Sequence, residues 1–210
     1  KEVTRVKLTT ATTSALCLSC HEDKTAKNIK GVVHPPAVRD CMTCHDAHGS
    51  ENKNQLVKPA SGDGKENLCL TCHQTGMHVA EKGSRHAALD AGCDTCHTTH
   101  KTGPEPTAEN RFHLTKAAPA LCVDCHDVKD AELQKKHDNQ PFGTANCLQC
   151  HDPHQSDQPK LMVKFQHAPF QGNGCDTCHQ PAKDGKVVLT QTDVKLLCVT
   201  CHEDKANEIE

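Results

Sequence analysis

Residues 16–21 read Leu-Cys-Leu-Ser-Cys-His, and the last five positions of this stretch organise the whole chain. The pattern Cys-x-x-Cys-His occurs eight times and uses every one of the 16 cysteines. In chain order, motif 1 is Cys17, Cys20 and His21; motif 2 is Cys41, Cys44 and His45; motif 3 is Cys69, Cys72 and His73; motif 4 is Cys93, Cys96 and His97; motif 5 is Cys122, Cys125 and His126; motif 6 is Cys147, Cys150 and His151; motif 7 is Cys175, Cys178 and His179; motif 8 is Cys198, Cys201 and His202. Such regular use of one residue type calls for a chemical explanation.

The spacing of each motif suits attachment of a flat group. Residues three and four apart lie on one face of a helical turn, so two thiols and one imidazole face the same partner. The thiols can form thioethers with the vinyl groups of haem, while the imidazole ligates the iron. This is the attachment signature of c-type haem. The sequence therefore predicts eight covalently bound haem c groups.

Three other uses of paired cysteines compete with this interpretation. Zinc ribbons pair Cys-x-x-Cys units but do not require a histidine after the second cysteine of every copy. Thioredoxin-like redox sites use a single pair in a βαβ unit, an alternation that this sequence does not show. A disulfide framework has no need of the histidine. Eight copies that leave no cysteine over favour haem.

The composition points the same way. The 210 residues include no Trp, no Tyr and four Phe, and the hydrophobic fraction of 35% includes the cysteines. So little apolar bulk hardly offsets the entropy lost on folding. We expect the porphyrins to form the core, the haem-free chain not to fold, and a mainly irregular fold with short α-helices and little or no sheet. Two such helices are expected at 127–136 and at 193–206, the latter capped by Thr192 or Asp193.

Charge and hydropathy exclude other classes. The formal net charge is −3, and no basic patch alternates with aromatic residues, so nucleic-acid binding has no support. No apolar run approaches the roughly 20 residues of a membrane-spanning helix. A signal peptide would already have been removed.

The motifs form an internal repeat. Successive first cysteines are 24, 28, 24, 29, 25, 28 and 23 residues apart, so short and long steps alternate. Repeats of this kind stack as units that cannot bury their apolar faces alone. We expect one elongated domain, 1–210, built of paired-motif repeats at about 14–50, 66–102, 119–156 and 165–205.

Two kinds of motif alternate. Leucine-type motifs 1, 3, 5 and 8 have Leu before the first cysteine, and histidine-type motifs 2, 4, 6 and 7 have a leading histidine seven to ten residues upstream. The leading histidines are His34, His86, His137 and His167. Motifs 2, 4 and 6 continue as His-x-x-His, which adds the trailing histidines His48, His100 and His154. Motif 7 lacks a trailing histidine, and it directly follows another histidine-type motif.

The histidine count suits two imidazoles per iron. Eight of the 17 histidines lie inside the motifs, and seven more are leading or trailing. His78 and His113 remain; they align with Ala26 and Gln55 of the first unit, and we expect one to ligate the eighth iron and the other to be spare. Met42, Met77 and Met162 are interpreted as packing residues, because enough histidines are present.

The alternating pattern resembles the multihaem c-type cytochromes with doubled haem motifs, from about Leu16 to His202. This resemblance implies low-potential haems with two axial histidines, packed in a nearly continuous row and used in bacterial extracellular electron transfer. It also implies a periplasmic or extracellular location. The implied partners are other redox proteins: cytochromes, a porin–cytochrome conduit or a quinol-linked donor.

The leading hypothesis is an electron-transfer protein, not an enzyme, that passes single electrons along the haems and has no catalytic residue. Bis-histidine iron keeps six ligands in both oxidation states and leaves no open position for a substrate. Two alternatives stay open: a conductive filament subunit with the same chemistry, and a multihaem reductase of a small oxyanion.

Overall fold

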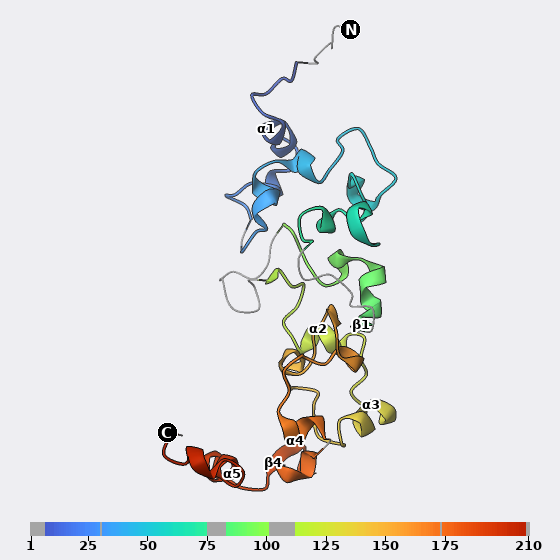
Figure 1. Cartoon of the computed structure of the whole chain (residues 1–210). Coiled ribbons are helices and arrows are strands. Elements are labelled where there is room, and N and C mark those ends of the chain that lie inside the picture. The colour runs from blue at the N-terminus through green and yellow to red at the C-terminus, as the bar shows by residue number, and fades with distance from the viewer. Residues whose placement is uncertain (1–6, 30, 75–82, 101–111, 173, 209–210) are drawn as a thin grey trace.

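The computed structural model describes residues 7–29, 31–74, 83–100, 112–172 and 174–208. The chain is elongated, with its two termini at opposite ends (Figure 1). Its α-helices are short: α1 Thr13–Leu18, α2 Ala120–Val123, α3 Ala131–Lys136, α4 Ala168–Gln171 and α5 Val194–Val199. The strands form two antiparallel pairs, β1 Ser84–Arg85 with β2 Gln155–Ser156 and β3 His179–Lys183 with β4 Lys186–Leu189. The predicted fold class, mainly irregular with short helices and little sheet, is confirmed.

Each motif folds as one tight helical turn. Motifs 1, 5 and 8 lie in or directly after α1, α2 and α5, whereas motifs 2, 3, 4, 6 and 7 form 3₁₀ turns. In seven motifs the carbonyl of the first cysteine accepts hydrogen bonds from the amides of both the second cysteine and the histidine; in motif 1 the two N···O distances are 3.2 and 2.9 Å. These bonds close a turn over the Cys-x-x-Cys-His spacing in each of the seven motifs.

Two helices are shorter than expected. Helix α3 begins at Ala131, because the carboxylate of Asp130 accepts a hydrogen bond from Leu133 N and caps the helix there. Helix α5 is capped by Asp193, one of the two residues expected, but it ends at Val199 rather than continuing to Ala206. At His202 the backbone, with φ −115° and ψ 54°, leaves the helical region, and a 3₁₀ turn follows.

A return segment follows every histidine-type motif. It pairs with the motif histidine through His45↔Leu56, His97↔Leu114 and His151↔Met162, and through His179↔Leu189 between β3 and β4. The next residue then donates its amide to the carbonyl of the second cysteine, as Val57 does to Cys44 at 2.9 Å. The four return segments make these motifs structurally equivalent, although their loops differ in length.

Strands β1 and β2 join two distant parts of the chain, with Ser84 opposite Ser156 and Arg85 opposite Gln155. Gly83 permits this close approach, since a Cβ atom there would clash with the carbonyl oxygen of Ser156. The hydroxyl of Ser84 donates to Gln158 O at 2.6 Å and accepts from Leu161 N at 2.8 Å. The approach to motif 4 is thereby fixed to the return segment of motif 6.

The described residues bury no apolar side chain, and Asn67, 2% exposed, is the buried polar side chain among them. Large apolar side chains such as Phe165 and Leu196 are exposed. The described part of the polypeptide therefore forms no hydrophobic core of its own, in agreement with the composition. Within the described ranges no helix is long and apolar enough to cross a membrane.

Candidate haem-binding sites

Six motif histidines each face a leading or trailing histidine. The distances between ring centroids are 5.8 Å for His34–His73, 6.0 Å for His45–His100, 6.0 Å for His86–His126, 5.9 Å for His97–His154, 6.2 Å for His137–His151 and 6.0 Å for His167–His202. Two imidazoles on opposite sides of one metal, each bonded at about 2 Å, have centroids roughly 6 Å apart. The six pairs therefore fit the axial positions of a haem iron.

The pairs follow a rule that connects separate motifs. A leading histidine faces the leucine-type motif that comes next, as in His34–His73, His86–His126 and His167–His202. A trailing histidine faces the histidine-type motif before its own, as in His100–His45 and His154–His97. Four of these five sites consequently take their two imidazoles from different repeat units, whereas His167 and His202 both lie in the unit 165–205.

His137 departs from this rule by facing His151 of its own motif, with the two rings inclined at 60°. The next motif, motif 7, is of the histidine type, so no leucine-type motif is there to receive His137. Motif 7 also carries Ala182 at the trailing position and can offer nothing to His151. His137 fills the position that this break in the alternation leaves open.

Backbone carbonyls set the tautomer of the paired imidazoles. The Nδ1 atoms of His45, His97 and His151 lie 2.9, 2.7 and 3.0 Å from carbonyl oxygens of their return segments, at Asn54, Phe112 and Lys160. His86 and His137 make the same kind of contact with Pro153 and Leu133. With Nδ1–H donated to a carbonyl, the Nε2 lone pair is left for a metal.

Strained backbone aims two of these carbonyls. Asn54 and Gln55, and likewise Lys160 and Leu161, have φ between 51° and 59°, in the left-handed region that non-glycine residues rarely adopt. Asn54 and Lys160 hold the carbonyls that orient the imidazoles of motifs 2 and 6. Strain of this kind persists where the surrounding contacts fix it, typically at functional sites.

Partial burial lowers the pKa of several leading and trailing histidines. Burial lowers the pKa of His34, with smaller contributions from His113 and His73. Burial likewise lowers the pKa of His100 and His154, and nearby positive groups add to the effect at both. A metal binds the neutral form of imidazole, so these shifts favour ligation.

Every cysteine of the eight motifs lies in the described part of the chain, and each is free of disulfide bonding. Cys20 is exposed, with its sulfur 4.0 Å from the hydroxyl of Ser19, whereas Cys150 and Cys178 are half-buried. The carbonyls of Cys150 and Cys178 accept hydrogen bonds, both at 2.9 Å, from the amides of Val163 and Thr190 in their return segments. The second cysteines of motifs 6 and 7 are thus held by the backbone, and all 16 thiols remain free to form thioethers.

Thiols of successive motifs influence one another's titration from motif 1 to motif 6. First cysteines interact in the pairs Cys17–Cys41, Cys69–Cys93 and Cys122–Cys147. The interaction within the second pair raises the pKa of Cys69 and lowers the pKa of Cys93 to about 6. Second cysteines interact instead in the pairs Cys44–Cys72 and Cys96–Cys125, where burial and then the charge of the neighbouring thiol raise the pKa of Cys44 and Cys96. The attachment points of neighbouring haems thus alternate along the chain.

The family model described as "Doubled CXXCH motif" matches residues 34–78, 86–131, 139–166 and 167–207, which is more than half of the chain. The chain belongs to this family. It is a multihaem c-type cytochrome, which is a class of electron-transfer protein.

The matched ranges of the doubled CXXCH family correspond to the pairing of histidines. Each of the ranges 34–78, 86–131 and 167–207 begins at or beside a leading histidine and contains the leucine-type motif that this histidine faces. The range 139–166 contains motif 6 alone, whose histidine faces His137. Motif 1 lies outside all four ranges.

This doubled CXXCH protein is also similar to the multiheme cytochrome MtrA of Shewanella baltica (strain OS185). The two are 26% identical over 153 residues, which cover 64% of this chain and 44% of that relative. The matched region is thus less than half the length of the relative.

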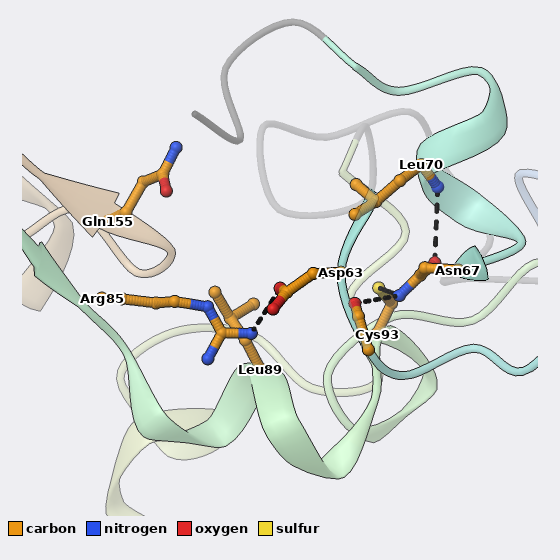
Figure 2. A pocket seen from close by; sticks show the side chains of 8 residues that line it. Asp63, Asn67, Leu70, Arg85, Leu89, Cys93 and Gln155 are labelled. Carbon is orange, nitrogen blue, oxygen red and sulfur yellow. Dashed lines mark hydrogen bonds and ion pairs between the residues drawn. The ribbon is translucent and has the colours of Figure 1, made fainter. Parts of the chain in front are cut away.

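Asn67 connects motifs 3 and 4 in this doubled CXXCH protein. Its Nδ2 donates to the carbonyls of Ala60 and Gly62 and lies 3.9 Å from the sulfur of Cys93; its Oδ1 accepts from the amides of Cys69 and Leu70. Figure 2 shows Asn67 between Leu70 and Cys93, with the Arg85–Asp63 ion pair nearby. These residues line a cavity of about 30 Å³, close to the volume of one water, which is too small for a substrate. Their hydrogen bonds hold the chain in place between motifs 3 and 4.

Some candidate ligands are not brought together. Among the described residues, His21 and His179 have no facing imidazole, and Nδ1 of His179 has no hydrogen-bond partner. His48 is exposed, and His113 lies edge-on to His34, whose ring already faces His73. His78, together with Met77, lies outside the described residues.

Sequence reasoning missed the return segments and Asn67. The return segments carry a weak signal, because Leu56, Leu114 and Met162 are each followed by Val or Thr and then Lys. Asn67 carries none, since the other leucine-type motifs have Ala or Leu at the equivalent position.

Proposed function

We propose that this cytochrome carries eight haem c groups and passes single electrons along them in a row. The observation that carries the proposal is the set of six facing histidine pairs, which gives six of the eight irons two imidazoles at the required separation. All eight motifs supply the cysteines and the proximal histidine. Haem supplies the one-electron chemistry, and the chain holds it in place.

The ligand assignment follows from the same pairs. The irons of motifs 2, 3, 4, 5, 6 and 8 take His100, His34, His154, His86, His137 and His167 as second ligands. His113, packed against a site that is already paired, is the spare histidine.

The chain's main contribution is to keep both imidazoles fixed. Carbonyls at Asn54, Phe112 and Lys160 hold proximal rings in one orientation. Tethering by two repeat units restrains the irons of motifs 2, 3, 4 and 5 from both sides. Six ligands in both oxidation states leave little to rearrange when an electron arrives. A carrier needs this rigidity, whereas an enzyme acting on a small oxyanion needs an open iron position.

Neighbouring sites are also held from shared backbone junctions. The amide of His34 donates to Thr99 O at 3.2 Å, next to His100, and the amide of His86 donates to His154 O at 2.9 Å. The second ligands of motifs 2 and 3, and those of motifs 4 and 5, are therefore positioned together. These junctions support short steps between successive haems.

We place the protein in the periplasm or outside the cell, with other redox proteins as donor and acceptor. The doubled CXXCH family and the similarity to a multiheme cytochrome support this assignment. The attachment chemistry also supports it, because thioether formation requires reduced cysteine pairs and takes place on exported chains.

Haem counting and ligand binding test the proposal. The mass of the purified holoprotein and its reductive titration should give eight haems and eight electrons per chain, as the eight motifs require. Carbon monoxide added to the reduced protein should leave the Soret contributions of the six paired haems unchanged. A count below eight, or a Soret shift involving several haems, would contradict the proposed wire.

A further inference from the structure

The two imidazoles at motif 6 are inclined more steeply than those of the other facing pairs. The rings of His137 and His151 make an angle of 60°, whereas the other facing pairs in the described part of the chain are inclined at between 13° and 39°. Each ring of an axial pair contains the line that joins it to the metal. The angle therefore measures how far one ring is rotated against the other about that line, and motif 6 is the furthest from parallel.

A half-buried aromatic ring fixes the plane of His137. The Phe142 ring stacks on this imidazole with the centroids 4.1 Å apart and the planes inclined at 19°. At the edge of the imidazole, Nδ1 lies 2.8 Å from the carbonyl oxygen of Leu133 in helix α3. A stacked face and a hydrogen-bonded edge leave the ring one orientation. His151 is held separately by the carbonyl of Lys160 at 3.0 Å, so neither ring turns to match the other.

The segment after His137 is shaped to bring Phe142 back onto it. The first cysteine of motif 6 comes ten residues after His137, whereas the other leading histidines lie seven or eight residues before theirs. In this longer segment Asp138 and Asn139 both adopt left-handed φ values, 55° and 54°. The amide of Asn139 donates to Gln134 O at 2.9 Å, so the chain reverses directly after helix α3. Two consecutive strained residues are typical of a position with a functional constraint.

The angle between two axial imidazoles matters to a haem iron because each ring donates π electrons to one of two iron d orbitals. Parallel rings act on the same orbital, which raises its energy and stabilises the oxidised iron, from which an electron is missing there. Inclined rings act on both orbitals, so the two stay close in energy and the oxidised iron loses part of this stabilisation. The expected signs of inclination are a strongly anisotropic EPR signal and a higher reduction potential than the same ligands give when parallel.

We propose that Phe142 is a positioning residue that sets the plane of His137 and thereby raises the reduction potential of the haem bound at motif 6. The inference rests on the proposed octahaem function and deepens it. Stacking by Phe142 and the carbonyl of Leu133 hold one ligand, while the carbonyl of Lys160 holds the other at a large angle to it. The row then has one position, at motif 6, where an electron is retained more strongly than its two histidines alone would cause.

Low-temperature EPR and potentiometric titration of the holoprotein test the inference with three variants. His137→Ala removes the ligand, so the low-spin signal that it abolishes belongs to the motif 6 haem, and this signal should be strongly anisotropic in the wild type. Phe142→Leu keeps the apolar bulk and removes the flat face, so the same signal should become rhombic and one haem should titrate at a lower potential. Phe142→Tyr keeps the flat ring and should retain both the signal and the potential of the wild type.

The matched control is Phe170→Leu. Phe170 also follows a leading histidine, His167, but within the described ranges its ring stacks on no imidazole. This variant should leave the motif 6 signal and its potential unchanged. An unchanged signal and potential in Phe142→Leu would overturn the inference, as would a Phe142→Tyr variant that behaves like Phe142→Leu. A rhombic motif 6 signal in the wild type would overturn it without any variant of Phe142.

Failure of this inference is distinguishable from failure of the proposed function. A protein with eight haems and reversible reduction in which Phe142→Leu has no effect overturns the role of Phe142 and leaves the row of haems intact. A count below eight in the wild type overturns the proposed function itself.

Discussion

Motifs 1–5 and motifs 6–8 are built from the same parts but connected differently. In the first group leucine-type and histidine-type motifs alternate, and every facing pair described there joins two repeat units. In the second group two histidine-type motifs are adjacent, and His137 turns back on its own motif. The order of motif types thus determines which histidine reaches which iron, and a local substitute appears where that order breaks.

The two groups also differ in what holds the motifs beside one another. In the first group the buried side chain of Asn67 connects motifs 3 and 4 through hydrogen bonds to the carbonyls of Ala60 and Gly62 and to the amide of Cys69. In the second group an exposed hydrogen bond connects the segment before motif 6 with motif 7, since Gln140 Nε2 donates to Gln180 O at 3.1 Å. Substitutions in the first group should therefore be the more damaging.

The largest effect is expected from His154→Ala. It removes the second imidazole of motif 4 and a backbone-anchored residue that links two units, so one iron becomes open. One haem more than in the wild type should then bind carbon monoxide in the reduced protein, as a shift in the Soret band. His113→Ala is the matched control and should leave the spectrum unchanged; a shift there would show that the spare histidine is misassigned.

His137 faces the motif 6 histidine in place of the trailing histidine that motif 7 lacks, and restoring that trailing histidine should make His137 unnecessary. His137→Ala alone should open the motif 6 iron to carbon monoxide. Ala182→His restores the trailing histidine that motif 7 lacks, so the double variant should again be closed. If the double variant binds carbon monoxide as readily as His137→Ala, the pairing rule does not extend across the break.

Asn67→Ala should destabilise the protein by roughly 3 kcal/mol, because buried carbonyl and amide groups lose their partners. The matched control is Asn146→Ala, an exposed asparagine that accepts one hydrogen bond from Leu148 N at 3.2 Å, with an expected cost of about 0.5–1 kcal/mol. Guanidinium unfolding of both oxidised holoproteins measures the difference. Equal losses would mean that Asn67 does not connect the two motifs.

The smallest effect concerns the caps of equivalent helices at the two ends. The Asp193 carboxylate accepts from Lys195 N at 2.8 Å and from Leu196 N at 3.4 Å, whereas the Thr12 hydroxyl accepts from Ala15 N at 3.1 Å. Asp193→Ala should therefore cost about 1 kcal/mol and Thr12→Ala about 0.5 kcal/mol. Thermal unfolding followed at the haem band would reveal a reversed order.

Much of the site was predictable, because thioether attachment fixes Cys-x-x-Cys-His as a local sequence pattern. The turns at the motifs, the absence of an apolar core and the sparse sheet follow from that pattern and from the composition. The sequence could also identify His34, His86 and His100 as ligand candidates, since they recur at constant offsets. It could not say that His100 reaches back to motif 2, because that depends on how the units fold against each other.

The remaining features depend on backbone geometry that carries no residue signature. Asn54 and Lys160 adopt left-handed φ values without being glycine. Their carbonyls contact the imidazoles of His45 and His151 from the return segments, which explains this backbone conformation. The helix expected to run to Ala206 ends early because the backbone at His202 leaves the helical region and a 3₁₀ turn follows. Helical propensity alone does not contain that constraint.

The direction of each histidine pairing sets the order in which the haem sites of the chain can be completed. In a chain that emerges N-terminus first, His34 is already present when His73 arrives, so that ligand waits for its iron. Under the proposed ligation the opposite holds at motif 2, where His45 would wait for its partner His100, which emerges 55 residues later. During maturation, a haem attached at such a histidine-type motif would therefore lack its second histidine for a time. At this stage the site would be most accessible to an incorrect ligand.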